Sequence, residues 1–185
     1  MEHHDTPNRW QGLVLGIAGG ALGTMAMGGY WKAAQALTGE DPRTLANEGG
    51  SRPFDDISLV GTHHSPEESS TAAMGRIAYE QLAGKPPESE ETKSTLSYVV
   101  HYGYGSLQGG LYGATRSGAA PPDVPGGLAF GTGMWLFGDE LGASLLGLAD
   151  GPSKFPPKQH LHRLAAHLVY GLTVAATTRV LHRLL

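Results

Sequence analysis

The chain has no cysteine, which excludes a disulfide framework, a thiolate nucleophile and a thiolate-ligated zinc site. Charged residues are also scarce, at 16% of the chain against about 25% in ordinary soluble domains. Lys and Arg number 13 against 17 Asp and Glu, so a basic surface for nucleic acid is lacking as well. We therefore expect no nucleic-acid partner, and any metal or acid–base chemistry must come from histidine and carboxylate side chains.

The charges that are present leave long gaps. Residues 10–31, WQGLVLGIAGGALGTMAMGGYW, form an uncharged run of 22 residues with aromatic residues at both ends. A helix of this length spans the roughly 30 Å hydrocarbon core of a bilayer, and aromatic side chains favour its two interfaces. Three more runs of low charge follow, and Asp139 and Glu140 interrupt the second of these three. The sequence predicts an all-α integral membrane four-helix bundle, one domain over 1–185, with helices at about 10–37, 94–116, 124–149 and 159–183.

The polar residues concentrate in residues 38–93, which hold 11 of the 17 acidic residues. We expect a long polar loop here between the first two helices, with a short surface helix at about 69–84. Two interpretations compete with the membrane assignment. One is a soluble, glycine-rich helical protein, and the other is a secretory signal peptide at residues 10–31. That run is longer than a usual signal segment, which argues against the signal peptide.

Glycine makes up 28 of the 185 residues and is concentrated in the uncharged runs. Lipid tails give no hydrophobic drive for helices to associate, so small residues that allow close backbone approach become the packing device. A phosphate-binding loop is not supported, because no Lys-Ser/Thr pair follows the glycines and no βαβ unit surrounds them. Four-residue spacing predicts helix-packing rows at Gly12, Gly16, Gly20, Gly105, Gly109, Gly113, Gly127 and Gly131.

Two short similarities suggest an internal repeat. GLVLGIAGGALG (12–23) aligns with GLAFGTGMWLFG (127–138), and the pattern HxxYG occurs at 101–105 and again at 167–171. Two tandem helical hairpins would then share one orientation, related by an axis along the membrane normal. Because glycine is so common in this chain, chance alignment is the alternative.

Ionisable residues inside the predicted helices are the candidates for function. A charge at the centre of a membrane helix costs roughly 2.5 to 3.5 kcal/mol on insertion scales, so such groups usually find partners inside the bundle. Structural hydrogen bonding, proton or ion handling, and a metal site are the three interpretations, in that order. We expect no catalytic residue and no cofactor. The candidate buried polar cluster comprises His101, Asp139, Glu140, His160 and His167.

Four segments resemble the YagU-like family of small bacterial membrane proteins, which is classed as a domain of unknown function. They are GLxxGxxGGxxGTxAM from residue 12, HYGYGSLQGGLYG from 101, WLFGDELGASLLGL from 135 and HLHRLAAHLVYG from 160. The resemblance implies a multi-pass protein of the bacterial inner (plasma) membrane with unknown biochemistry and a loose link to acid resistance. It brings no catalytic residues. Family members often have a proline after the acidic pair, where this chain has Leu141 and Gly142.

These observations predict a small polytopic inner-membrane protein with a structural or proton-linked role of the acid-stress type. Its expected partners are the lipid bilayer and either further copies of itself or a larger membrane complex. The alternatives are a non-catalytic accessory subunit of a membrane complex and a histidine-based metal-binding membrane protein. The discriminating feature is whether the acidic and histidine side chains converge inside the bundle.

Overall fold

The computed structural model describes residues 8–47, 51–66, 68–116 and 123–185, and every regular element within these ranges is helical. The prediction of an all-α chain is confirmed. Residues 48–50 and 67 of the predicted polar loop lie outside the described residues. The α-helices of the described chain are α1 (Arg9–Thr38), α2 (Ser70–Ala83), α3 (Glu90–Thr115), α4 (Val124–Gly133), α5 (Gly142–Leu145) and α6 (Pro157–Leu184).

The third predicted helix, 124–149, is not continuous, which corrects the prediction at this point. After α4 the chain enters a π-helical turn, η2 (Met134–Glu140), and only then forms the short α5. The N–H of Leu141 bonds to the Leu136 carbonyl at 3.0 Å, five residues back, so one extra residue is wound into the turn. Two 3-10 turns, η1 (Pro42–Thr44) and η3 (Pro152–Lys154), lie in the connections.

Local signals explain where the long helices begin and end. The Asn8 side chain accepts the N–H groups of the first turn of α1, and Gly39 ends that helix in the left-handed conformation at φ 76°. Ser89 caps α3 in the same way, and Glu90 and Glu91 place negative charge at the positive end of the helix dipole. With these residues at its start, α3 begins at Glu90, four residues before the predicted start at 94.

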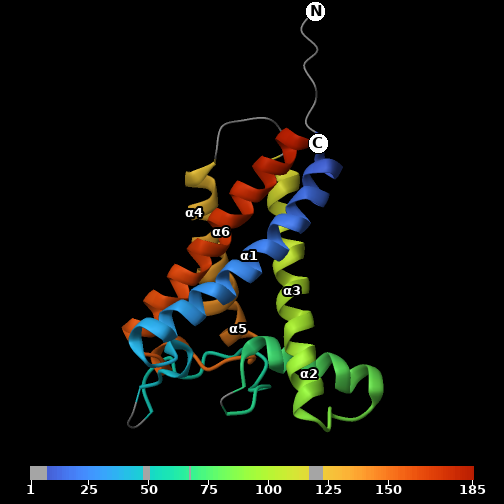
Figure 1. Cartoon of the computed structure of the whole chain (residues 1–185). Coiled ribbons are helices and arrows are strands. Elements are labelled where there is room, and N and C mark those ends of the chain that lie inside the picture. Colours follow the sequence, from blue (N-terminus) through green and yellow to red (C-terminus); the bar gives the residue numbers. More distant parts are fainter. Residues whose placement is uncertain (1–7, 48–50, 67, 117–122) are drawn as a thin grey trace, which may run out of the picture.

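The helices form an antiparallel bundle (Figure 1). The start of α1, the end of α3, the start of α4 and the end of α6 lie at one end, and the polar connections with α2 and α5 lie at the other. α1 packs against α3 on one side and α6 on the other, and α6 also packs against α4. The order across the bundle is therefore α3, α1, α6, α4, with α2 packed on the first turns of α3.

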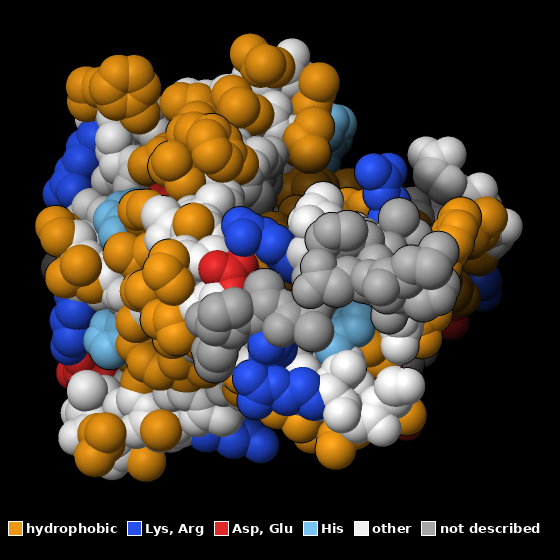
Figure 2. Space-filling model, turned by 90° about the horizontal axis from the view of Figure 1, so that it is seen from above, with side chains coloured by type: hydrophobic (Ala, Val, Ile, Leu, Met, Phe, Trp, Pro, Cys, Tyr) orange, Lys and Arg blue, Asp and Glu red, His pale blue; other side chains and the backbone are white. Residues whose placement is uncertain are grey.

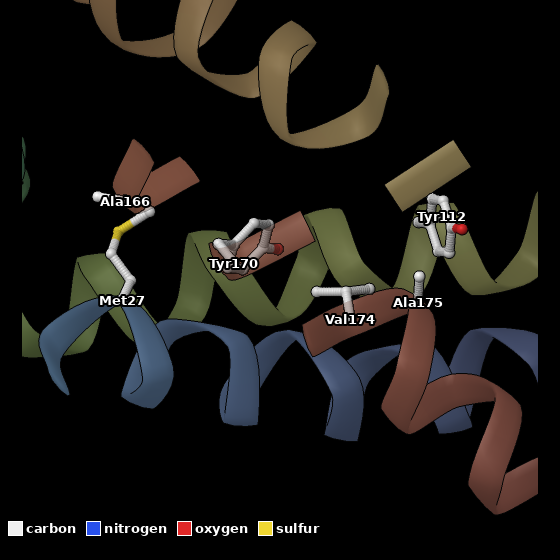
Figure 3. Close-up of a cluster of buried hydrophobic side chains, with 6 residues drawn as sticks. All are labelled: Met27, Tyr112, Ala166, Tyr170, Val174 and Ala175. Carbon is white, nitrogen blue, oxygen red and sulfur yellow. The ribbon is translucent and has the colours of Figure 1, made fainter. Parts of the chain in front are cut away.

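The apolar core is small and lies where α1, α3 and α6 meet. Tyr170 is its central side chain, 2% exposed, and its hydroxyl donates to the Gly105 carbonyl of α3 at 2.6 Å. Because Tyr170 belongs to α6, this hydrogen bond links two helices that otherwise touch little. Figure 3 shows the six members of this core, which are Met27, Tyr112, Ala166, Tyr170, Val174 and Ala175.

Glycine rows line the contact between α1 and α3. A Cβ atom at Gly109 would lie 2.5 Å from the Gly16 carbonyl oxygen and 2.6 Å from the Gly20 Cα, closer than any side chain tolerates. Gly113 meets Gly12 in the same way, one turn further along. The two backbones are in direct contact, as small residues permit.

A second seam of glycine joins α4 to α6. Gly127 and Gly131 lie against the α6 backbone, and a Cβ at Gly171 would lie 2.8 Å from the Gly131 nitrogen. The two antiparallel hairpins, α1 with α3 and α4 with α6, therefore use the same packing device.

The two hairpins differ in register. In the aligned HxxYG segments Gly105 corresponds to Gly171, and Gly105 lies against Gly20. Gly171 lies instead against Gly127, which the repeat aligns with Gly12. The offset between Gly12 and Gly20 is about two helical turns. The repeat therefore describes the topology and the glycine seams but not the helix contacts residue by residue.

The outer surface of the bundle is rich in large apolar side chains. Seen from the end that holds the start of α1, hydrophobic side chains cover much of the outline, with Lys and Arg between them (Figure 2). Two helices of the described chain, α1 and α6, are long and apolar enough to cross a membrane by length and composition. On α1 the exposed large side chains are Trp10, Val14, Ile17, Leu22, Met25 and Leu37.

Candidate functional site: an acidic and histidine cluster

The π-helical turn η2 sets the position of Glu140. Residues five apart become neighbours in such a turn, whereas in an α-helix they point roughly 140° apart. Trp135 therefore reaches its neighbour, and its Nε1 donates to the Glu140 Oε1 at 2.9 Å. Glu140 is 5% exposed, so this carboxylate is held inside the bundle by one indole hydrogen bond from its own segment.

His160, from the first turn of α6, pairs directly with Glu140. Its Nδ1 lies 2.8 Å from the Glu140 Oε2, and its Nε2 lies 3.1 Å from the Pro152 carbonyl oxygen. The carbonyl can only accept, so Nε2 carries a proton. The short contact on the other side also needs a proton between Nδ1 and Oε2, held either as imidazolium with carboxylate or as imidazole with carboxylic acid. These contacts make His160 and Glu140 a directly paired histidine and carboxyl group.

Arg163 joins the two carboxylates. Its Nε lies 3.8 Å from Asp139 Oδ2 and its Nη1 lies 3.9 Å from Glu140 Oε1. The guanidinium also stacks on the Phe155 ring, 4.1 Å from the ring centroid. The cluster predicted from the sequence did not include this arginine. The signal that could have identified it is its spacing, because a residue three positions after His160 shares that face of the helix.

His101 and His167 lie near this cluster but do not hydrogen-bond to the acidic pair. The Nδ1 of His167 lies 2.8 Å from the Arg163 carbonyl oxygen within its own helix. His101, from α3, is close enough to His167 and Asp139 to interact with both electrostatically. The structure therefore brings all five predicted residues into one region and adds Arg163 and Trp135, with Glu140 and His160 as its hydrogen-bonded centre.

The segment between α5 and α6 covers this centre. The Ser144 hydroxyl lies 3.1 Å from the Glu140 carbonyl oxygen and 2.7 Å from the Asp150 carbonyl oxygen, so it links the π-helical turn to that segment. Pro152, in the same segment, is the carbonyl partner of His160. The cluster thus lies at the end of the bundle that carries the polar connections, directly beneath them.

A metal site finds no support in this geometry. Within the described ranges, no group of three or more His, Asp or Glu side chains could hold a metal ion. The cluster instead pairs two carboxylates with one arginine and one histidine that contact them directly. Its contacts are ion pairs and hydrogen bonds.

Comparison with known proteins adds no assignment. The chain matches no family model, no curated protein sequence and no solved structure. The resemblance to the YagU-like family stays a prediction.

Proposed function

We propose that the chain is a multi-pass membrane protein whose Glu140–His160 pair binds one proton within the helix bundle. The membrane part includes α3 and the α4–α5 segment beside the two longer apolar helices, because glycine seams join the second half of α3 to α1 and join α4 to α6. The YagU-like resemblance, with its loose link to acid resistance, agrees with a proton-linked role.

The distribution of side chains supports the membrane part of this proposal. Large apolar residues such as Leu22 and Met25 face outward from α1, while the packed faces between helices carry glycine and buried polar groups such as Thr24 and Thr178. Soluble monomers rarely expose contiguous apolar surface on this scale. Lipid is the occupant that makes such a surface stable.

Charging the exposed face of α1 tests the membrane assignment. We expect Leu22→Glu with Met25→Glu to abolish stable insertion, because each charge costs roughly 2.5 to 3.5 kcal/mol against lipid. The measurement is the share of protein that stays with membranes after alkaline washing. Leu37→Glu is the matched control, since Leu37 is 87% exposed at the polar-loop end of α1. Wild-type protein released by washing without detergent would contradict the assignment.

The single observation that carries the proton-binding proposal is the pair of contacts made by His160. Both ring nitrogens face acceptors, so a proton is required on both of them or on the facing Glu140 carboxyl group, which is 5% exposed. Arg163 and Asp139 keep the surrounding charge balanced, so the proton can be gained or lost without leaving several unpaired charges.

Infrared titration of the purified protein in lipid tests this proposal. We expect a carboxyl and imidazole signal from the pair that disappears in Glu140→Gln and changes in His160→Gln, because each variant removes one side of the shared proton. His63→Gln serves as the control, since His63 contacts only backbone of its own loop through its ring. An unchanged titration in Glu140→Gln would overturn the assignment of the proton to this pair.

The accessory-subunit alternative is less well supported. It needs glycine faces that are free to dock on a partner, whereas Gly16, Gly109, Gly131 and Gly171 are occupied by contacts within the chain. An internal polar cluster, which that alternative does not need, is also present.

A further inference from the structure

The polar loop after α1 docks on the segment that covers the cluster. Four backbone hydrogen bonds cross this contact, one of them from the Asn47 N–H to the Lys154 carbonyl at 2.8 Å. Leu59 N–H donates to the Leu145 carbonyl at 3.0 Å, His63 N–H to the Gly147 carbonyl at 2.7 Å, and Gly151 N–H to the Asp55 carbonyl at 2.7 Å. The loop therefore lies along the 145–151 segment.

His64 lies in this contact with both ring nitrogens against acceptors. Its Nδ1 is 3.0 Å from the Gly147 carbonyl oxygen, and its Nε2 is 3.4 Å from Asp150 Oδ1. The His64 side chain is 10% exposed, and Asp150 is 44% exposed. A neutral imidazole has one N–H and can serve only one of these acceptors, whereas the imidazolium cation donates to both.

We infer that His64 is an acid-strengthened latch that fastens the polar loop onto the segment covering the cluster. On protonation the ring keeps its bond to the Gly147 carbonyl and gains a charge-assisted bond to the Asp150 carboxylate. Acid therefore closes the loop over the bundle end, and neutral pH loosens it. This latch does not depend on proton binding by Glu140 and His160.

The other charged groups around His64 also favour its protonated form. Glu68, at the start of α2, interacts electrostatically with His64 and is paired with Arg76 at 2.9 Å. Burial opposes ionisation of Glu68, but hydrogen bonds from Arg76 and the Ser65 N–H outweigh it, so the pKa of Glu68 is lowered. Arg76 also donates to the His63 carbonyl at 2.5 Å, and the His63 ring lies against the Val60 carbonyl of the loop itself. Glu68 thus keeps its negative charge near His64.

Backbone hydrogen exchange in the full-length protein, held in lipid nanodiscs, tests the latch. The amides of Leu59, His63 and Gly151 cross the docking contact, so their protection reports directly on its closure. Free imidazole titrates near pH 6.5, so we compare exchange at about pH 7.5 and about pH 5.5, corrected for the intrinsic rate. We expect protection to rise about fivefold at the lower pH, the difference between a neutral and a charge-assisted hydrogen bond.

Matched variants separate the latch from other acid effects. In His64→Gln the rise in protection should vanish, and in Asp150→Asn it should shrink, while His63→Gln should retain it. His160→Gln, which disrupts the proposed proton-binding pair, should also retain it, so failure of that pair and failure of the latch give different results. A rise that persists in His64→Gln, or wild-type protection that is equal at the two pH values, would overturn the inference.

Discussion

Replacing Gly109 with leucine is expected to lower the free energy of unfolding by about 3 kcal/mol, at the upper end of the usual cost of overpacking. The physical reason is the identity of the atoms that the new side chain meets. A Cβ at this position would lie 2.5 Å from the Gly16 carbonyl oxygen and 2.7 Å from the Gly20 nitrogen, and both belong to the α1 backbone. Backbone cannot rotate away as a side chain can, so α1 and α3 must separate.

Gly103→Leu is the matched control on the same helix. A Cβ at Gly103 would meet no described atom within 4 Å, so leucine there adds apolar surface without displacing α1. Both variants gain helix propensity from the loss of glycine, which removes that effect from the comparison. Thermal unfolding in detergent micelles, followed by circular dichroism, measures the difference. Equal stability of the two variants would contradict a direct backbone contact between α1 and α3.

The glycine seams show what the sequence could predict. Four-residue spacing identified which faces of the helices carry glycine, because spacing alone sets the face. Spacing does not set which turn of one helix meets which turn of the next. The Gly171 contact lies about two turns away from where the repeat would place it, since the side chains of both helices decide the register.

The polar cluster shows a different limit. Its members were predictable because ionisable residues in an otherwise uncharged helix need partners. The pairing of Glu140 with His160 was not predictable. It depends on a π-helical turn, which rotates the residues after Met134 away from the positions they would have in an α-helix. No proline or other strong local signal marks that turn in the sequence. The contact of His64 with Gly147 could not be predicted from the sequence either, because 83 residues separate the two.

Replacing Glu140 alone is expected to lower the free energy of unfolding more than replacing its neighbour Asp139 does. In Glu140→Leu the Trp135 Nε1 and one nitrogen of His160 lose their acceptor, while Arg163 keeps only Asp139. Breaking a buried ion pair from one side typically costs about 3 to 5 kcal/mol.

A double-mutant cycle with His160→Leu separates this pair from its neighbours. If the two side chains act as a unit, the double variant should recover about 1 to 3 kcal/mol relative to the sum of the single losses, because no unpaired partner is left buried. Asp139→Leu is the control, since Asp139 meets Arg163 only at 3.8 Å and is 27% exposed. We expect it to cost about 1 kcal/mol or less. Chemical unfolding in mixed micelles measures the wild type, the two single variants and the double variant, and strictly additive losses would mean that Glu140 and His160 do not act as a unit.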